Sequence, residues 1–261
     1  MQMSVLVVSC DKYSDVWDLF FKLFWRHWSD CPYPVYLGAN FLNYFYPRVT
    51  TLLVGEDLNW GGSTRRMVEQ IQSPYILLFL DDHFLLQTVR TDVIEACLKA
   101  LHGLGGGYLR LDPEPPPDRP VPGFVTLGAI ESDSPYRCSL HVSIWRRDVL
   151  LTLLREGETA WDMELVGSRR SGYLETGFYA TWKHVLRYDC EGIVRGKWTS
   201  GGLRLAHREG MPVDFSRRPS QTRFETAVRR LQKIKGRLFA LIPWGLRKPI
   251  LKARLRRAAY S

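Results

Sequence analysis

The most constraining feature of this sequence is a run of six apolar residues, Tyr75 to Leu80, which ends directly in Asp81, Asp82 and His83. A strand with one solvated face alternates apolar and polar side chains, whereas this run is apolar at every position. It therefore predicts a strand that is buried on both faces, in the centre of an α/β sheet. Open sheets of this class bind ligands just beyond the carboxyl ends of their strands.

The segments around this run alternate between strand and helix patterns, as an α/β domain requires. Apolar or β-branched runs predict strands at 4–9, 34–37, 51–54, 75–80, 108–111, 124–130 and 139–145. Helical spacing predicts helices at about 14–28, 63–71, 91–102, 147–155 and 161–171. The fold class that we expect is α/β, with a single mixed, Rossmann-like sheet flanked by helices over residues 1–222, and a tail over residues 223–261.

The net charge of +9 is concentrated in that tail. Twelve Lys or Arg residues and one acid, Glu225, lie between Arg223 and Ser261, whereas the first 222 residues carry 24 basic and 26 acidic side chains. Apolar residues alternate with the basic ones, and Pro243 and Pro249 divide the segment, which predicts short amphipathic helices. Such helices are typical of binding to an anionic membrane surface, and the alternative is packing against the domain. No base-reading module accompanies the charge, so nucleic acid is not an expected partner.

Other signals narrow the compartment and the chemistry. The sequence has no run of eighteen apolar residues and no N-terminal signal pattern, and its five cysteines form no CxxC pair. We therefore expect a cytoplasmic protein, peripheral on the inner face of the cell membrane through its tail, without a structural zinc. Neither a GxSxG elbow nor a Walker motif is present, which argues against the hydrolases and ATPases that use them.

The adjacent carboxylates of Asp81 and Asp82 are the sharpest candidate site. Neighbouring acids at a strand end repel each other, and a divalent cation or ligand hydroxyl groups would relieve that repulsion. In the alternative interpretation one acid caps a turn and the other is solvated. Asp11 follows the first strand in the same way and predicts either a contact to a nucleotide or a cap of the next helix.

Two further segments carry candidate residues. Trp60 to Arg66 joins a Gly-Gly turn to a helix start, where backbone N–H groups together with Arg65 and Arg66 are suited to phosphate oxygens. Trp161 to Glu164 holds two acids, Asp162 and Glu164, which lie about 200° apart on a helix, so only one is able to face a cleft as a general base.

These blocks in combination resemble bacterial GT-A-type glycosyltransferases of polysaccharide and lipopolysaccharide biosynthesis. The resemblance covers roughly residues 4 to 215. It rests on Ser9-Cys10-Asp11, Trp60-Gly61 with Arg65 and Arg66, the strand ending in Asp81-Asp82-His83, Ile144 to Leu150, Trp161 to Glu164, and Gly192 to Trp198.

The resemblance implies a nucleotide-sugar donor over the carboxyl edge of the sheet and a glycan or lipid-linked glycan acceptor. Ser9 and Asp11 would lie near the nucleotide, and Asp81, Asp82 and His83 would hold Mn²⁺ or Mg²⁺ on the donor diphosphate. The motif reads DDH and not D-x-D. In a metal-independent enzyme, Arg65, Arg66 or Lys197 would instead neutralise the leaving diphosphate. The implied base is Glu164, or failing it Asp162, in an inverting single displacement, and Trp145 and Trp161 are candidates for an acceptor platform.

Two alternatives stay open at this point. A sugar nucleotidyltransferase shares the expected fold, although the glycine- and lysine-rich loop expected after its first strand is missing. A non-catalytic, membrane-associated carbohydrate-binding or scaffold protein would keep the fold without using the acidic residues.

Overall fold

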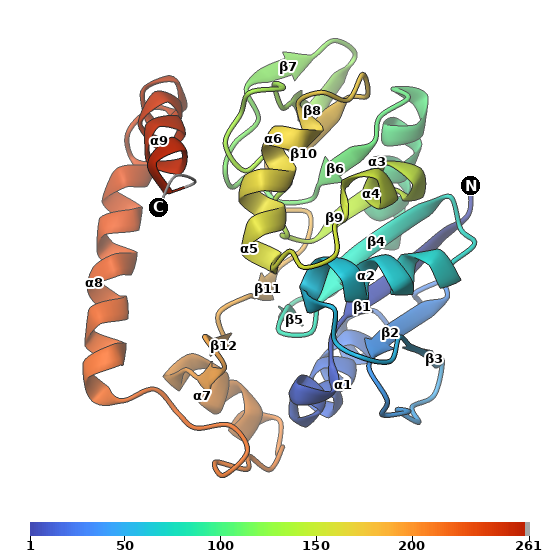
Figure 1. The fold of residues 1–261 in the computed structure, drawn as a ribbon, viewed down its shortest axis with the longest axis vertical. Helices are drawn as coiled ribbons and strands as arrows, with labels where there is room; N and C mark the ends of the chain where they lie inside the picture. The colour runs from blue at the N-terminus through green and yellow to red at the C-terminus, as the bar shows by residue number, and fades with distance from the viewer. Residues whose placement is uncertain (259–261) are drawn as a thin grey trace.

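The computed structural model describes residues 1–258, and a sheet of nine strands forms its centre (Figure 1). The strands are β1 (Met3–Val8), β2 (Val35–Ala39), β3 (Val49–Leu53), β4 (Tyr75–Leu80), β6 (Tyr108–Arg110), β7 (Arg119–Val121), β8 (Phe124–Ala129), β9 (Ser143–Arg146) and β10 (Phe178–Thr181). Their order is β3-β2-β1-β4-β9-β6-β10-β8-β7. Strands β1 to β4 are parallel, β9 runs antiparallel to both β4 and β6, and β10 is parallel to β6.

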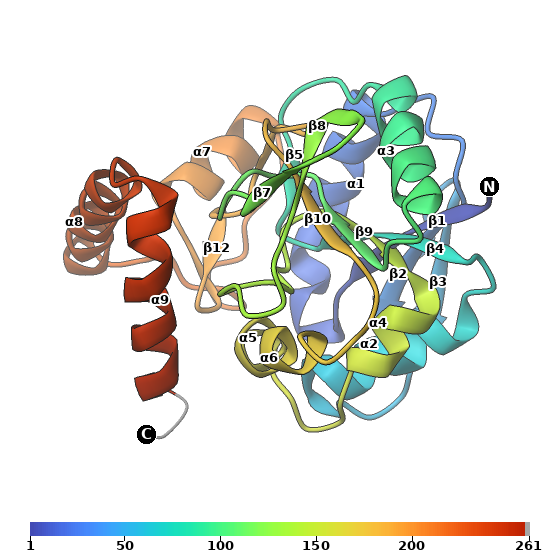
Figure 2. The ribbon, with the colours of Figure 1, turned by 90° about the horizontal axis from the view of Figure 1, so that it is seen from above.

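Helices cover both faces of this sheet. The four that pack on it are α1 (Trp17–His27), α2 (Asn59–Gln70), α3 (Thr91–Gly103) and α4 (Arg147–Leu153). Val5 and Val7 of β1 share one core with α1 and α3, whereas Leu6 and Val8 share the second core with α2 and α4. Figure 2 shows these helix pairs on the two sides of the sheet. The predicted fold class, a mixed α/β sheet flanked by helices, is confirmed, and so is the doubly buried strand at Tyr75–Leu80.

Short elements complete the domain at the carboxyl edge of the sheet. They are η1 (Asp11–Val16), β5 (Phe84–Leu85), α5 (Ala160–Asp162), the π-helical turn η2 (Met163–Gly167), α6 (Ser168–Ser171), β11 (Tyr188–Asp189), β12 (Ile193–Val194), β13 (Lys197–Trp198) and α7 (Ser200–Arg208). The predicted helix at 161–171 is therefore three consecutive pieces, α5, η2 and α6. The predicted strand at 139–145 begins only at Ser143, because the amides of Leu140 and Val142 donate to side chains instead of to a neighbouring strand.

The basic tail forms two helices, α8 (Arg223–Ala240) and α9 (Trp244–Ala258), and the last three residues of the predicted tail, 259–261, lie outside the described residues. Pro243 separates the two helices, as expected, whereas Pro249 lies inside α9. Thr222 and Glu225 form a capping box at the start of α8, which fixes where the helix begins. None of the described helices is both long enough and apolar enough to cross a membrane.

The tail is tied to the domain through α9. Lys248 reaches Asp118 at 2.7 Å and Glu131 at 2.6 Å, and Trp244 Nε1 donates to Asp118 Oδ1 at 2.8 Å. Burial raises the pKa of Asp118, but the bonds from Lys248 and Ser134 outweigh it, so the pKa of this carboxyl lies below its usual value. α9 thus packs on the domain, whereas α8 stands away from the sheet (Figure 1).

Candidate functional site

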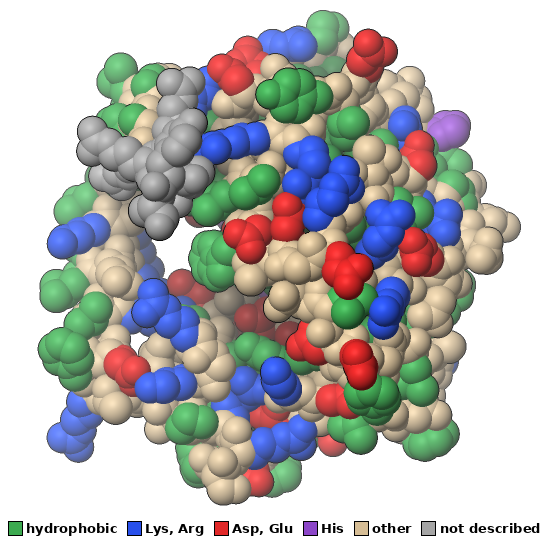
Figure 3. Space-filling view, in the orientation of Figure 1, with side chains coloured by type: hydrophobic (Ala, Val, Ile, Leu, Met, Phe, Trp, Pro, Cys, Tyr) green, Lys and Arg blue, Asp and Glu red, His purple; other side chains and the backbone are tan. Residues whose placement is uncertain are grey.

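A cleft of about 1170 Å³ lies between the carboxyl edge of the central sheet and α8. Asp82, His83, His141, Trp161 and Glu164 line it on the side of the domain. Residues of α8 and of the β12–β13 hairpin line the other side. Figure 3 shows the molecule hollowed between these two parts, with acidic side chains deep in the hollow. The position matches the place where open α/β sheets bind ligands.

Asp81 lies behind the cleft instead of lining it. Its side chain is buried and accepts a hydrogen bond from the hydroxyl of Ser9, which itself accepts one from Trp17 Nε1 at 2.7 Å. Burial, together with repulsion from Asp82, raises the pKa of Asp81 well above its usual value. Ser9 and Asp81 therefore lie together at the sheet edge, where the hydroxyl of Ser9 donates a hydrogen bond to the carboxylate of Asp81.

Asp82 is the strand-end carboxylate that faces the cleft. Burial raises its pKa to about 7, and repulsion from Asp189 adds to the shift, whereas attraction to Arg218 opposes it. A carboxyl group of this kind gains from a cation or a hydrogen-bond donor that arrives with a ligand. Arg218, which sequence analysis did not single out, is held in place by two bonds to Asp15, at 2.7 and 2.8 Å.

His83 contributes a neutral imidazole to the floor of the cleft. Burial lowers its pKa to about 3, and its Nδ1 accepts a hydrogen bond from the amide of Leu80 at 3.2 Å. Its ring packs on that of Tyr188, with 4.9 Å between ring centres. One of the two nitrogens that a metal would use is therefore already occupied.

The donor set at this edge suits a cation shared with a ligand. Within residues 1–258, no group of three or more His, Cys, Asp or Glu side chains converges as a metal centre. Mg²⁺ is commonly held by one or two carboxylates together with phosphate oxygens of a substrate. Asp82 fits that arrangement, whereas Asp81 is already hydrogen-bonded to Ser9 behind the cleft.

Asp11 holds the loop after β2. Its carboxylate accepts hydrogen bonds from the amides of Asn40 at 2.8 Å and Phe41 at 3.0 Å. It caps no helix, because η1 begins at Asp11 itself without a side-chain cap. Asp11 thus orders the loop after β2, and its own side chain does not line the cleft.

The predicted phosphate site around Trp60 to Arg66 is corrected by the structure. The amide of Gly61 donates to the carbonyl of Glu158 at 2.8 Å, and a Cβ at Gly61 would meet the carbonyl oxygen of Arg155 at 2.1 Å. The Gly-Gly pair therefore permits close packing of α2 on the 155–158 segment, so this helix start is closed to a ligand.

Arg65 and Arg66 are likewise used for packing contacts. Arg65 donates to the carbonyl of Leu151 at 2.9 Å, and Arg66 donates to the carbonyl of Val54 at 2.8 Å. These bonds tie α2 to α4 and to the end of β3. Neither side chain lines the cleft, so the structure does not bring them to Asp82.

The two tryptophans predicted as an acceptor platform lie in different environments. Trp145 is completely buried on β9 and packs on Tyr108, with 4.3 Å between ring centres. The prediction that Trp145 contacts an acceptor is therefore wrong, because β9 is covered on both faces. Trp161 is 69% exposed and lines the cleft.

The two acids after Trp161 also separate. Asp162 forms a capping box with Thr159, whose amide and hydroxyl donate to Asp162 Oδ2 at 2.8 and 2.7 Å. These bonds hold the pKa of Asp162 below its usual value, and its side chain does not line the cleft, which corrects its prediction as a base. Glu164 lies in the π-helical turn η2 and lines the cleft.

Glu164 is held by one of its two oxygens. Oε1 accepts hydrogen bonds from the amide of Leu140 at 2.8 Å and from the hydroxyl of Ser139 at 3.3 Å. Oε2 bonds to no residue within the described chain. A carboxylate fixed in this manner keeps one oxygen available to accept a proton.

Lys197 lines the far side of the cleft, on β13, and its Nζ lies 2.7 Å from Glu225 Oε1 on α8. The sequence prediction did not include the residues that face it from α8, because packing of the tail against the domain was only the alternative and named no contacting residues. It also missed His141, whose Nδ1 lies 3.1 Å from the hydroxyl of Tyr188 and 3.5 Å from Asp112 Oδ2. Asp112 directly follows the predicted strand 108–111, as Asp81 follows the predicted strand 75–80, and that parallel was available in the sequence.

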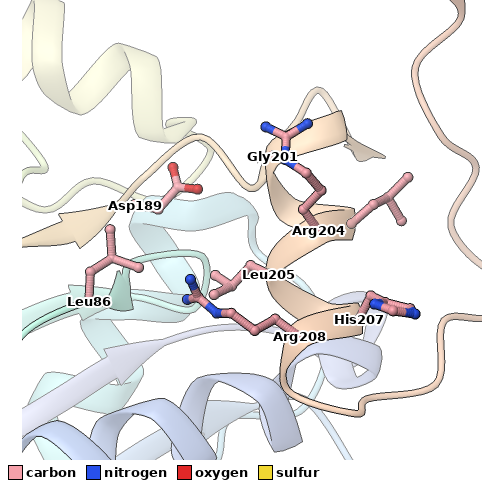
Figure 4. Close-up of a pocket in the computed structure, with 8 residues that line it drawn as sticks. Leu86, Asp189, Gly201, Arg204, Leu205, His207 and Arg208 are labelled. Atoms are coloured by element: carbon pink, nitrogen blue, oxygen red, sulfur yellow. The ribbon is translucent and has the colours of Figure 1, made fainter.

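A second, more open pocket of about 700 Å³ lies between α7 and the β5–β11 pair. Figure 4 shows Arg204, His207 and Arg208 projecting from α7, with Leu86 and Asp189 across from them. None of the residues predicted from the sequence lines this pocket. The larger cleft is therefore the candidate site.

No protein-family model and no curated protein matches this chain. Among solved structures, it is similar to Staphylococcus aureus TarS, with a TM-score of 0.47, 10% identity, and coverage of 72% of this chain and 36% of that chain. Residues 1–349 of TarS in complex with UDP-GlcNAc give a TM-score of 0.46 and 11% identity, covering 69% of this chain and 58% of that one. CMP:2-keto-3-deoxy-manno-octonic acid synthetase complexed with CTP gives a TM-score of 0.42 and 11% identity, over 81% of this chain and 100% of that chain. The chain thus spans less than two thirds of either TarS chain.

Proposed function

We propose that this protein is a glycosyltransferase that moves a sugar from a nucleotide-sugar donor to a hydroxyl group of a glycan or lipid-linked glycan acceptor. The observation that carries the proposal is the shared cleft of Asp82 and Glu164 at the carboxyl edge of the sheet. One carboxyl group has its pKa raised to about 7 by burial, and the other has an oxygen without a hydrogen-bond partner among residues 1–258. Phosphate binding through a cation requires a carboxylate in the place of Asp82, and proton abstraction requires one with an available oxygen, as Glu164 has.

In the proposed reaction, Glu164 Oε2 takes the proton of the acceptor hydroxyl group. The acceptor oxygen attacks the anomeric carbon, and the bond from that carbon to the diphosphate breaks, with its electron pair leaving on the nucleoside diphosphate. Exposed Trp161 beside Glu164 offers an aromatic face for a sugar ring. The single displacement inverts the configuration at the anomeric carbon.

Mn²⁺ or Mg²⁺ held by Asp82 would neutralise the charge that builds on the departing diphosphate. Lys197 lines the same cleft. If no metal is required, Lys197 is proposed to neutralise that charge instead. The donor nucleotide is proposed to lie toward the loops that follow β1 and β2, which Asp11 joins.

A nucleotide-binding screen tests this function. The purified protein is heated with UDP, GDP, CDP or dTDP, each with Mn²⁺, with Mg²⁺ or with EDTA. A ligand that binds only the folded state raises the melting temperature, so we expect one nucleotide to do so selectively. A shift that survives in EDTA would remove the metal from the proposal, and no shift with any nucleotide would contradict the nucleotide-sugar donor.

The outer face of α8 is proposed to rest on an anionic membrane surface. Exposed apolar residues recur at helical spacing along one side of α8 and at the residue that follows it, and basic residues flank them; they are Leu231, Ile234, Leu238 and Leu241. Apolar insertion and attraction between basic residues and anionic lipids act together in such helices. The protein would then be peripheral on the cytoplasmic face of the membrane, close to a lipid-linked acceptor.

Replacing Leu231 and Leu238 together by Glu should weaken binding to phosphatidylglycerol-containing vesicles by more than about tenfold. These side chains are 60% and 61% exposed, and each buried Leu contributes roughly 1.5–3 kcal/mol. Val125→Glu is the matched control, because Val125 is 96% exposed on β8, outside the tail. Vesicle sedimentation measures the binding, and equal binding by the double variant and by wild type would locate the membrane contact elsewhere.

A further inference from the structure

The far wall of the cleft carries an excess of positive charge. Four cations from the β12–β13 hairpin and α8 line it, namely Arg195, Lys197, Arg229 and Lys233, against the carboxylates of Glu191 and Glu225. The near wall carries the carboxyl groups of Asp82 and Glu164. The cleft is therefore polarised from an acidic floor at the sheet to a cationic wall at α8, which suits a ligand with an anionic group at one end.

Arg229 is a cation of this wall with one side-chain nitrogen that lacks a hydrogen-bond partner among the described residues. Its side chain is only 14% exposed, and its Nη2 lies 3.2 Å from Glu191 Oε2. Its Nη1 is buried and has no hydrogen-bond partner within residues 1–258. Lys233 converges on the same carboxylate of Glu191, so a single acid serves two cations. A buried guanidinium N–H without an acceptor is unfavourable, and an anionic oxygen from a ligand would satisfy it.

Arg229, on the cleft side of α8, lies opposite the exposed apolar residues on the outer face of the same helix. Residues two positions apart on a helix point about 200° away from each other, so Arg229 and exposed Leu231 lie on nearly opposite sides. A helix with its side chains is about 10 Å across. If α8 rests on a membrane through Leu231, its cationic side thus faces the cleft within about one helix diameter of that surface.

We infer that Arg229, together with Lys197 and Lys233, forms a phosphate-binding site on the α8 wall of the cleft. The inference deepens the proposed function and rests on it, because it assigns the tail helix a direct contact with substrate. The chemistry recognised is a phosphate monoester or diphosphate. A lipid-linked acceptor carries such a group at the membrane surface, and the nucleotide-sugar donor carries one in solution.

The test compares Arg229→Gln with Arg230→Gln. Each substitution removes one positive charge from the same helix, but Arg230 is exposed and does not line the cleft. Binding is measured by calorimetry with inorganic pyrophosphate and UDP, and by sedimentation with phosphatidylcholine vesicles that contain either phosphatidate or phosphatidylglycerol. We expect Arg229→Gln to weaken binding of the phosphate-bearing probe by about tenfold or more, and Arg230→Gln to change it by less than about twofold.

The probe that responds identifies the source of the phosphate. A loss confined to pyrophosphate and UDP indicates the donor, whereas a loss toward phosphatidate that exceeds the loss toward phosphatidylglycerol indicates a lipid-borne phosphate. Arg229→Lys keeps the charge without the planar fork of donors, so it should restore binding only in part. Melting temperatures of all three variants near that of wild type establish that they are folded.

Equal binding by the two glutamine variants, with every probe, would overturn the phosphate site. If wild type also transferred sugar, the proposed function would stand without this inference. If wild type bound no nucleotide but bound phosphatidate through Arg229, the glycosyltransferase proposal would fail and the phosphate site would remain.

Discussion

Glu164→Gln should lower the turnover of the nucleotide-sugar donor by about 10²- to 10⁴-fold, the range over which a general base contributes. The amide keeps a carbonyl oxygen for the bonds from Leu140 and Ser139, so the loop should stay in place. It has no oxygen that accepts a proton, and for this reason the loss should appear in kcat. Release of nucleoside diphosphate in the presence of acceptor measures the effect.

Asp162→Asn is the matched control for that variant. The carboxylate of Asp162 caps α5 through Thr159, so we expect a lower melting temperature with turnover close to that of wild type. Full activity in Glu164→Gln, or an equal loss of activity in both variants, would contradict the role of Glu164.

Asp82→Asn should abolish metal-dependent binding of the nucleoside diphosphate and, without ligand, raise the melting temperature at pH 8. The folded-state pKa of Asp82 is raised to about 7, whereas the ordinary value is 3.8. The folded protein thus retains a proton that the unfolded chain loses, and stability falls as the pH rises from about 4 to about 7. The loss is complete by pH 8, and the uncharged Asn avoids it.

The gain in melting temperature should be smaller at pH 5, where the folded protein still carries most of that proton. Asp214→Asn is the control, because Asp214 is exposed and Ser216 lowers its pKa, so its replacement should give no gain at pH 8. A melting temperature of Asp82→Asn that changes equally at pH 5 and pH 8 would show that the burial of Asp82 carries no electrostatic cost.

The fold was predictable where local sequence determines burial. Six consecutive apolar residues at Tyr75–Leu80 indicate a strand covered on both faces, and the structure has that strand between β1 and β9. Sequence also indicated that Asp81 and Asp82 lie at its carboxyl end. It did not indicate which of them faces the cleft, because the hydroxyl of Ser9, 72 residues away along the chain, holds Asp81 inside.

Side-chain direction was the weakest part of the sequence prediction. The same indole of Trp145 suits a platform or a core, and its burial follows from β9 lying between β4 and β6, a pairing that the local pattern does not encode. Asp162 and Glu164 were correctly expected to face different ways. Thr159 decides which one is a cap, through a capping box that was present in the sequence.

The cleft itself depends on long-range pairs. Lys197 meets Glu225 across 28 residues, and Arg229 bonds to the carbonyl of Glu191 across 38. Composition identified the tail as basic and amphipathic, but long-range contacts such as these place α8 across the cleft from the sheet edge. For this reason Lys197 was predicted from the sequence, but the residues of α8 that complete the far wall were not.

The most direct test of the proposed glycosyl transfer follows a radiolabelled sugar from the nucleotide sugar that the binding screen selects. Wild-type protein is incubated with that donor and with lipids extracted from bacterial membranes, and Glu164→Gln is run in parallel. We expect label in the lipid fraction, matched by release of nucleoside diphosphate, with wild type alone. Label that stays on the nucleotide, or formation of a nucleotide sugar and pyrophosphate from a sugar phosphate and a nucleoside triphosphate, would contradict glycosyl transfer.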